Sequence, residues 1–258
     1  MPARDLALLT EAAREAGRVA LRYWRRDPKH WDKGGEHGPV SEADLAVNDL
    51  LKDRLLSARP DYGWLSEETP DNPARLARDS VFIIDPIDGT RAFIAGEETF
   101  SHSLAVAHKG RVTAGVVFLP ALDRIYVASE TSPPLRDGQP IAASQRDRLE
   151  GADILTTKAN LVPEKWPGGA PEVTRHFRAS LAYRLCLAAE GRFDGMLTLR
   201  EAWEWDIAAG SLIATKAGAV VTDRHGAALR FNTASALAQG VLALPPAPHA
   251  EAVRRLRG

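Results

Sequence analysis

Two aspartates separated by two residues form the most informative motif of the sequence. Asp85 and Asp88 follow an apolar, β-branched run at 81–84 that predicts a buried strand. Pro86 fixes one backbone torsion between the two acids. We expect this turn to aim both carboxylates, together with the Ile87 carbonyl, at one point. Hard oxygen ligands of this kind suit Mg²⁺.

Gly89 and Thr90 come directly after the second aspartate and are expected to begin a helix. Glycine permits a close backbone approach, and the threonine is expected to cap the helix. Free backbone amides at a helix N-terminus bind phosphate. The stretch also fits an Asx-turn that only joins a strand to a helix. Taken alone, the motif does not separate these two interpretations.

Further acids lie in two other segments. Glu67 and Glu68 are adjacent and follow a short predicted strand, and Asp206 begins a segment rich in small residues. Adjacent glutamates on a loop are most often only solvated, and an acid at a helix start is often only a partner of the helix dipole. Both alternatives stay open at this point.

The sequence disfavours several other chemistries. The seven histidines show no metal-ligand spacing and Cys186 is the single cysteine, so zinc sites and thiol nucleophiles are not expected. His102 lies within a predicted strand, where we expect a structural role. No phosphate-binding loop of the nucleotide triphosphatase type is present.

The elements that must position these acids begin with two helices. Apolar residues spaced three and four apart predict a helix from residue 6 to about residue 27. Residues 29–40 are polar and rich in glycine, and we expect a mobile loop. Ser41 then has the features of an N-cap, with Asp44 in the capping-box position, and begins a helix that ends near residue 58.

Predicted strands dominate residues 62–128, whereas strands alternate with helices from residue 152 onwards. The first part therefore reads as α+β and the second as α/β. We expect two halves, residues 1–138 and 139–258, that share an interface. Before residue 139, the predicted strands are 62–65, 81–84, 103–107, 112–118 and 124–128, followed by a hairpin turn at Asp137-Gly138. After it, strands at 152–156, 194–198, 219–222 and 240–244 alternate with helices at 180–190, 206–217 and 248–257.

Composition limits the class of protein. The 258 residues are 45% hydrophobic and 26% charged, which is ordinary for a globular protein. The net charge of −1 gives no global basic field, so direct nucleic-acid binding is not expected. No apolar run reaches the roughly 18–20 residues that a membrane span needs. We expect a cytoplasmic protein.

With Asp85, Asp88 and Asp206 in these sequence contexts, the chain resembles the inositol monophosphatase superfamily of Mg²⁺-dependent, lithium-sensitive phosphatases. The resemblance runs from about residue 5 to residue 257, and its two signatures together are highly specific. Ala95 departs from the first signature, where a polar or basic residue is usual, but this position is not a ligand. The first signature is matched by Phe82 through Phe93 with its core Asp85-Pro86-Ile87-Asp88-Gly89-Thr90, and the second by Trp205-Asp206-Ile207-Ala208-Ala209-Gly210-Ser211 through Gly218-Ala219.

The resemblance implies a fold and a set of site residues. The fold is a layered α-β-α-β-α sandwich, and homodimers are common in the family. The N-terminal half would bind the metal, and the C-terminal half would contribute Asp206 and the substrate specificity. The first Mg²⁺ would be held by Glu67, Asp85 and the Ile87 carbonyl, the second by Asp85, Asp88 and Asp206, and a third, weaker ion by Glu67 and water. The implied catalytic residues are Asp44, Glu67 and Thr90, and the expected substrate-binding residues are Asp88, Gly89, Thr90, Ser180, Arg184, Arg200 and Asp206.

The resemblance implies a small phosphate ester as the substrate, and the residues near the second signature favour an ester with a second anionic group. Inositol-selective relatives carry a glutamate seven residues before the second-signature aspartate, where this chain has Leu199 followed by Arg200. Arg184 adds a second cation, although each arginine also fits an ion-paired surface position. The segments 64–68 and 180–184 are most similar to those of bacterial 3′(2′),5′-bisphosphate nucleotidases. The resemblance therefore implies an enzyme that converts 3′-phosphoadenosine 5′-phosphate to AMP and phosphate. The alternatives are an inositol-1-phosphate phosphatase, a histidinol phosphatase, and a non-catalytic partner of the transcription machinery.

Overall fold

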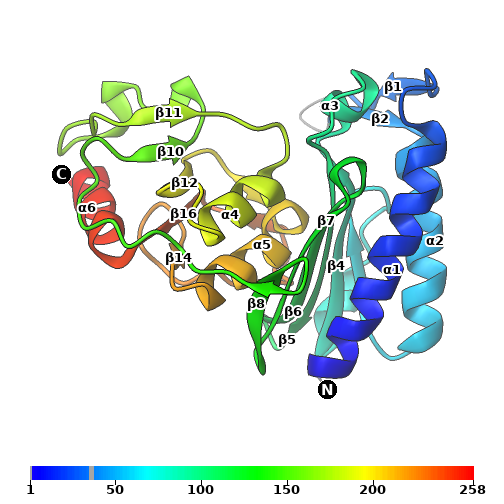
Figure 1. Ribbon diagram of the computed structural model, residues 1–258. Helices are drawn as coiled ribbons and strands as arrows, with labels where there is room; N and C mark the ends of the chain where they lie inside the picture. The colour runs from blue at the N-terminus through cyan, green and yellow to red at the C-terminus, as the bar shows by residue number, and fades with distance from the viewer. Residues whose placement is uncertain (1, 35–37) are drawn as a thin grey trace.

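Two long helices form the outermost layer of the computed structural model, which describes residues 2–34 and 38–258 (Figure 1). α1 (Pro2–Tyr23) buries the predicted apolar stripe, and α2 (Glu42–Ala58) packs beside it. α2 begins where predicted, and its capping box is confirmed. α1 ends earlier than predicted, because Arg25 and Asp27 adopt left-handed backbone conformations that no helix continues through.

A seven-stranded sheet forms the second layer and is antiparallel except for its first pair. The strand order follows the chain, and only β3 and β4 run parallel. The predicted meander and hairpin are confirmed, and both Asp137 and Gly138 have the positive φ that a two-residue hairpin turn requires. The strands are β3 (Gly63–Ser66), β4 (Ser80–Asp88), β5 (Ser101–His108), β6 (Arg111–Leu119), β7 (Arg124–Ser129), β8 (Ser132–Arg136) and β9 (Gln139–Pro140).

β4 is longer than the predicted strand, and its extension carries the two aspartates. The strand continues to Asp88, but its pairing with β5 shifts register between Asp85 and Asp88. Such a bulge re-aims side chains at the end of a strand. The prediction that the strand stops at residue 84 is therefore wrong, and in place of the expected turn the two acids lie on either side of a register shift within the strand.

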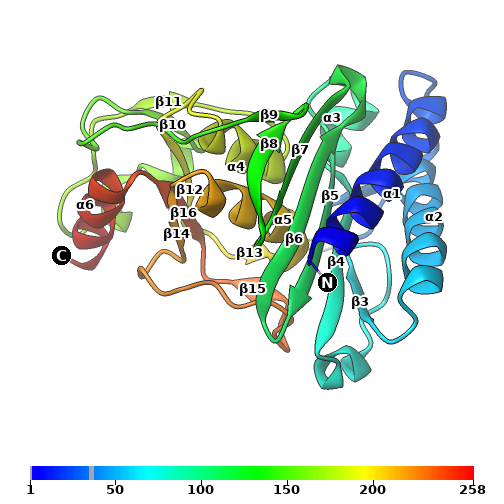
Figure 2. The same cartoon turned by 60° about the horizontal axis from the view of Figure 1, so that its bottom comes forward.

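The remaining three layers come from the C-terminal part of the chain (Figures 1 and 2). Two helices pack between the large sheet and a mixed sheet of order β11-β10-β12-β16-β14, and α6 covers the far side. The predicted α-β-α-β-α sandwich is confirmed. Each predicted element of this half lies within two residues of its expected bounds: β10 (Asp153–Leu155), α4 (Leu181–Ala189), β12 (Gly195–Thr198), α5 (Glu204–Lys216), β14 (Val220–Thr222), β16 (Val241–Leu244) and α6 (Pro246–Arg257).

Some short elements were not predicted. The segment 29–40, expected to be a mobile loop, contains two paired strands in its described part, and residues 35–37 lie outside the described residues. These strands are only three residues long and carry no apolar alternation over a useful length. The unpredicted elements are β1 (His30–Asp32), β2 (Pro39–Ser41), β11 (Thr174–His176), β13 (Ala202–Trp203), β15 (Leu237–Ala238), and the 3-10 helices η1 (Pro73–Ala77), η2 (Pro120–Leu122), η3 (Lys158–Asn160) and η4 (Pro163–Lys165).

Packing explains why α5 lies in the middle of the molecule. Its residues are apolar or small around most of the helix, as expected of a helix covered on all sides. One continuous apolar core joins α4 and α5 to the large sheet. Within the described residues, no helix is both long and apolar enough to cross a membrane.

Candidate active site

A cavity of about 510 Å³ brings together most of the site residues expected from the sequence. It lies where the C-terminal end of β4 meets the first turn of α5, so both halves of the chain contribute to its wall. The expected residues that line it are Glu67, Asp85, Ile87, Asp88, Gly89, Thr90, Arg184, Arg200 and Asp206.

Three aspartates form an oxygen cluster in this cavity. Asp85 and Asp88 come from the bulged end of β4, Asp206 comes from α5, and one carboxylate oxygen of each lies within 4.8 Å of the others. Asp85 Oδ1 is buried and has no hydrogen-bond partner within residues 2–34 and 38–258. Ser103 of β5 donates to the Trp205 carbonyl at 2.8 Å, which ties the start of α5 to the sheet.

The electrostatics of this cluster fit a divalent cation. Burial raises the pKa values of Asp85 and Asp206 well above the usual range for aspartate, and repulsion from the neighbouring acids adds to the effect. Burial also raises the pKa of Asp88. A cation placed among these oxygens would relieve the repulsion and give Asp85 Oδ1 a partner. The donors are all hard oxygens, which is the ligand set of Mg²⁺.

Asp88 is held in place from behind by the start of α4. One of its oxygens accepts hydrogen bonds from the Ser180 hydroxyl and the Ala182 amide, each at 2.7 Å. The Ser180 hydroxyl also lies 2.9 Å from the hydroxyl of Ser101 on β5. Ser180, expected to bind substrate, therefore lies behind a carboxylate rather than among the residues that line the cavity.

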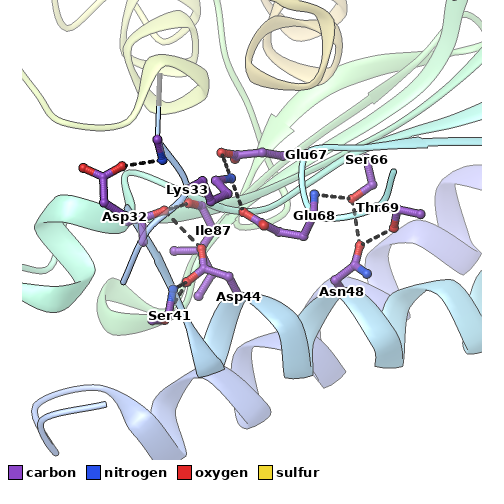
Figure 3. A network of polar contacts seen from close by, with 12 residues as sticks. Asp32, Lys33, Ser41, Asp44, Asn48, Ser66, Glu67, Glu68, Thr69 and Ile87 are labelled. Carbon is purple, nitrogen blue, oxygen red and sulfur yellow. Dashed lines mark hydrogen bonds and ion pairs between the residues drawn. The ribbon is translucent and has the colours of Figure 1, made fainter. Parts of the chain in front are cut away.

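Asp44 and Thr90 form a buried pair beside the cluster. The Thr90 hydroxyl lies 3.0 Å from Asp44 Oδ1 and 3.1 Å from the Ile87 carbonyl oxygen. The other Asp44 oxygen accepts from the amide and the hydroxyl of Ser41 (Figure 3). Burial raises the pKa of Asp44 to about 6. A carboxylate in this position accepts a proton near neutral pH.

The helix cap after β4 differs from the prediction. The N-cap of α3 (Thr90–Ile94) is Gly89, with a φ of 99° that favours glycine, and Thr90 is the first helical residue. The prediction of Thr90 as the cap is therefore wrong. Its hydroxyl faces Asp44 instead of the helix amides, because the left-handed glycine turns the chain before the threonine.

Glu67 is joined to a residue that the sequence did not single out. Lys33 Nζ lies 2.9 Å from Glu67 and 2.8 Å from Glu68 (Figure 3). Burial raises the pKa of Glu67 to about 7 despite the opposing charge of the lysine. No periodicity marks a lone lysine in a polar loop, so only the three-dimensional structure reveals this contact.

The two arginines of the specificity argument both line the cavity, but in different surroundings. Arg184 is buried, donates to the carbonyl oxygens of Arg178 and Ala179, and stacks on Phe177 with 4.5 Å from guanidinium to ring centre. Burial lowers its pKa. Arg200 is exposed at the wall of the cavity.

Leu199 does not face the substrate space. Its side chain is buried in the core beneath α6, and its neighbours in the chain line the cavity instead. Several lining residues were not expected from the sequence, since nothing in their spacing distinguishes them. They include Arg91, Thr157, Phe177 and Trp203, the last of which stacks on Trp205 with ring centres 4.7 Å apart.

Comparison with known proteins agrees with this geometry. A "Fructose-1,6-bisphosphatase/inositol-1-monophosphatase" of Thermotoga maritima is 33% identical over 215 residues, covering 83% of this chain and 82% of the relative. A "Putative Nus factor SuhB" of Neisseria meningitidis serogroup B is 30% identical over 226 residues, covering 84% and 85%. The structure of an IMPase from Thermotoga maritima superposes with a TM-score of 0.82 at 28% identity, covering 100% of this chain and 97% of the other.

The family model described as "Inositol monophosphatase family" matches residues 2–257, which is almost the entire chain. The aspartate cluster supplies the metal-binding chemistry on which such enzymes depend. The chain therefore belongs to the inositol monophosphatase family and is a metal-dependent phosphoric monoester hydrolase.

Proposed function

We propose that this enzyme hydrolyses the phosphate monoester of a small polyol of the inositol-1-phosphate class. The observation that carries the phosphatase chemistry is the cluster of Asp85, Asp88 and Asp206 beside the Asp44–Thr90 pair. The inositol-1-monophosphatase named for the Thermotoga maritima relative supports the substrate class. The relatives reported above are not bisphosphate nucleotidases, so the comparisons favour the inositol phosphate alternative over the nucleotidase preferred from the sequence.

The proposed roles follow from the positions of the side chains. Glu67, Asp85, the Ile87 carbonyl, Asp88 and Asp206 would hold two Mg²⁺ ions, and a weaker third ion would share Glu67. Bound Mg²⁺ supplies charge neutralisation for the phosphate and lowers the pKa of a water molecule.

The chain's own groups do the remaining work. Asp44, held by Ser41, would accept a proton from the attacking water through the Thr90 hydroxyl. The amides of Gly89 and Thr90 would contact phosphate oxygens at the start of α3. The cavity is large enough for a small phosphorylated ring.

A second candidate substrate carries a second phosphate. The observation in its favour is that Arg184 and Arg200 line the same cavity as the three aspartates. Guanidinium groups bind phosphate through charge-assisted hydrogen bonds. Sugar bisphosphates and 3′-phosphoadenosine 5′-phosphate both meet this description.

A substrate panel tests the proposal. Phosphate release is measured with Mg²⁺ on inositol-1-phosphate, histidinol phosphate, fructose-1,6-bisphosphate and 3′-phosphoadenosine 5′-phosphate, with EDTA as the blank. The highest kcat/KM on inositol-1-phosphate supports the main proposal, and the highest value on either bisphosphate supports the second candidate. Silence across the panel together with tight binding to a component of the transcription machinery would favour the non-catalytic alternative. The homodimer implied by the resemblance stays a prediction.

A further inference from the structure

Three consecutive residues of β5 each form a hydrogen bond with a group that adjoins the aspartate cluster. The Ser101 hydroxyl meets Ser180, which donates to Asp88. The Ser103 hydroxyl donates to the carbonyl of Trp205, the residue before Asp206. All three residues of this tripeptide are fully buried.

The side chain of the middle residue, His102, lies on the opposite face of the sheet. Side chains alternate across a strand, so His102 shares its face with Leu104 and Val106, which pack against the α1 and α2 layer. His102 Nδ1 is hydrogen-bonded to the carbonyl oxygen of Pro86. That carbonyl belongs to the backbone between Asp85 and Asp88.

This hydrogen bond lies at the place where the regular hydrogen-bond ladder between β4 and β5 is interrupted. The ladder between β4 and β5 shifts register between Asp85 and Asp88, and Pro86 has no amide hydrogen to donate. The backbone that sets the spacing of the two carboxylates therefore relies on contacts outside the regular ladder. The bond from His102 is such a contact.

The protonation of His102 is consistent with a donor role. A carbonyl only accepts, so Nδ1 carries the hydrogen. Burial lowers the pKa of His102 to about 4, which keeps the ring neutral at ordinary pH. Nε2 is then a buried acceptor, and it has no hydrogen-bond partner among the described residues. An apolar side chain would fill the same space without this unsatisfied atom, so packing alone does not account for a histidine here.

We propose that Ser101-His102-Ser103 is a positioning segment for the metal site, in which His102 fixes the bulge between Asp85 and Asp88 and Ser103 fixes the start of α5 next to Asp206. The segment touches neither substrate nor metal and acts through the backbone that carries the ligands. The proposal rests on the metal site of the proposed function, but it is independent of which ester is cleaved.

The test measures metal binding without substrate. Mn²⁺, which takes the same oxygen ligands, is titrated into the protein and its free concentration is followed by electron paramagnetic resonance. His102→Leu removes the donor at similar volume, whereas His102→Asn keeps an N–H close to the position of Nδ1. Ser103→Ala removes the second brace. Ser129→Ala is the matched control, because Ser129 is a buried serine of β7 whose hydroxyl, in the part of the chain that the structure describes, bonds only to Thr131 and Ser132.

We expect His102→Leu to weaken Mn²⁺ binding about 10-fold or more, as loss of a hydrogen bond behind a ligand does in metal sites. Ser103→Ala should weaken it in the same direction. His102→Asn should lie within about threefold of the parent, and Ser129→Ala should match it. Thermal unfolding in EDTA verifies that each variant is folded. If His102→Leu does not fold, His102→Gln takes its place, because its amide reaches the Nε2 position and leaves the Pro86 carbonyl without a donor.

Two results would overturn the positioning role. One is parental Mn²⁺ affinity in folded His102→Leu or His102→Gln. The other is a loss in His102→Asn as large as that in His102→Leu. A parent protein that binds no Mn²⁺ would overturn the metal site itself and this proposal with it, so failure of the proposed function is distinguishable from failure of the positioning role.

Discussion

Asp85 has the most demanding environment of the residues in the site. One of its oxygens has no partner among the residues that the structure describes. Burial raises its pKa, and repulsion from Glu67, Asp88, Asp206 and Asp44 adds to the effect. Such an arrangement is unfavourable for folding and favourable for binding a cation. Substitution of Asp85 should therefore change stability and activity in opposite directions.

We expect Asp85→Asn to lower kcat more than about 100-fold at saturating Mg²⁺, because it removes a charge shared by the ions that stabilise the transition state. The same variant should unfold at a higher temperature than the parent in EDTA, since the repulsion within the cluster is smaller. Phosphate release and calorimetry measure the two effects. Activity within tenfold of the parent would contradict the assignment of Asp85 as a ligand.

Arg200 at the cavity wall is the residue through which we test substrate specificity. If the exposed guanidinium at the cavity wall binds a second phosphate, Arg200→Ala should lower kcat/KM on bisphosphates by roughly 10- to 100-fold, the worth of a hydrogen bond to a charged group. The rate on inositol-1-phosphate should hardly change. Arg78→Ala, an exposed arginine outside the cavity, is the control. An equal loss on both kinds of substrate would show that Arg200 has a structural role.

The sequence predicts some site residues far better than others. Asp85, Asp88 and Asp206 lie in continuous signatures, so their segments are readable without a structure. Lys33 is not, because its ion pairs with Glu67 and Glu68 join a polar loop to a distant strand end. Leu199 was compared with the inositol-binding glutamate of relatives because of its spacing from Asp206, but its side chain is buried in the core.

At the scale of elements, α5 depends on small residues where it crosses its neighbours. A Cβ atom on Gly210 would lie 2.6 Å from the Cβ of Leu185 on α4, and one on Gly115 of β6 would lie 3.0 Å from the Ala209 Cα. These contacts let α5 approach both α4 and the large sheet. That approach places Asp206 next to the end of β4.

We therefore expect Gly210→Ala to destabilise the protein by roughly 1–3 kcal/mol, the usual effect of overpacking. The opposing gain in helix propensity is about 1 kcal/mol at most. Urea unfolding gives the free energy. Thr215→Ala, at an exposed position of the same helix, should change it by less than about 0.5 kcal/mol. A Gly210→Ala protein as stable as the parent would mean that α4 and α5 adjust freely.

The elements that sequence patterns predict are the ones with apolar stripes or apolar runs. α1 buries a regular stripe of side chains, and β5 and β6 are buried on both faces over nearly their whole length, so their segments are visible in the chain as a stripe and as continuous runs. β10 and β14 are as short as β1 and β2, but their apolar residues mark them as strands, whereas β1 is exposed throughout and β2 begins with a proline. The bulge of β4 is also absent from the pattern, because it arises from pairing with β5 and from the contact of His102 with Pro86.

For the whole molecule, the site lies where the end of β4 meets the first turn of α5, and its buried charge affects the stability of the fold. Burial raises the pKa of Asp44 to about 6 and that of Glu67 to about 7, and it raises those of Asp85 and Asp206 well above the usual value. In each case the folded protein binds protons more tightly than the unfolded chain does. Stability from these groups is therefore present at low pH and is lost as the pH rises through the folded-state values.

We expect the unfolding temperature in EDTA to fall relative to that in saturating Mg²⁺ as the pH rises from 5 to 8. Bound Mg²⁺ favours the charged carboxylates and removes the penalty, and its stabilising effect on the folded state grows with its affinity. The quantity to follow is the unfolding temperature in Mg²⁺ minus that in EDTA. The low pKa of His102 makes stability rise with pH in both conditions, and the subtraction removes this trend. Calorimetry at each pH gives the difference, and Asp85→Asn should show a smaller rise. A difference that stays constant, or that shrinks as the pH rises, would contradict the coupling of the buried carboxylates to metal binding.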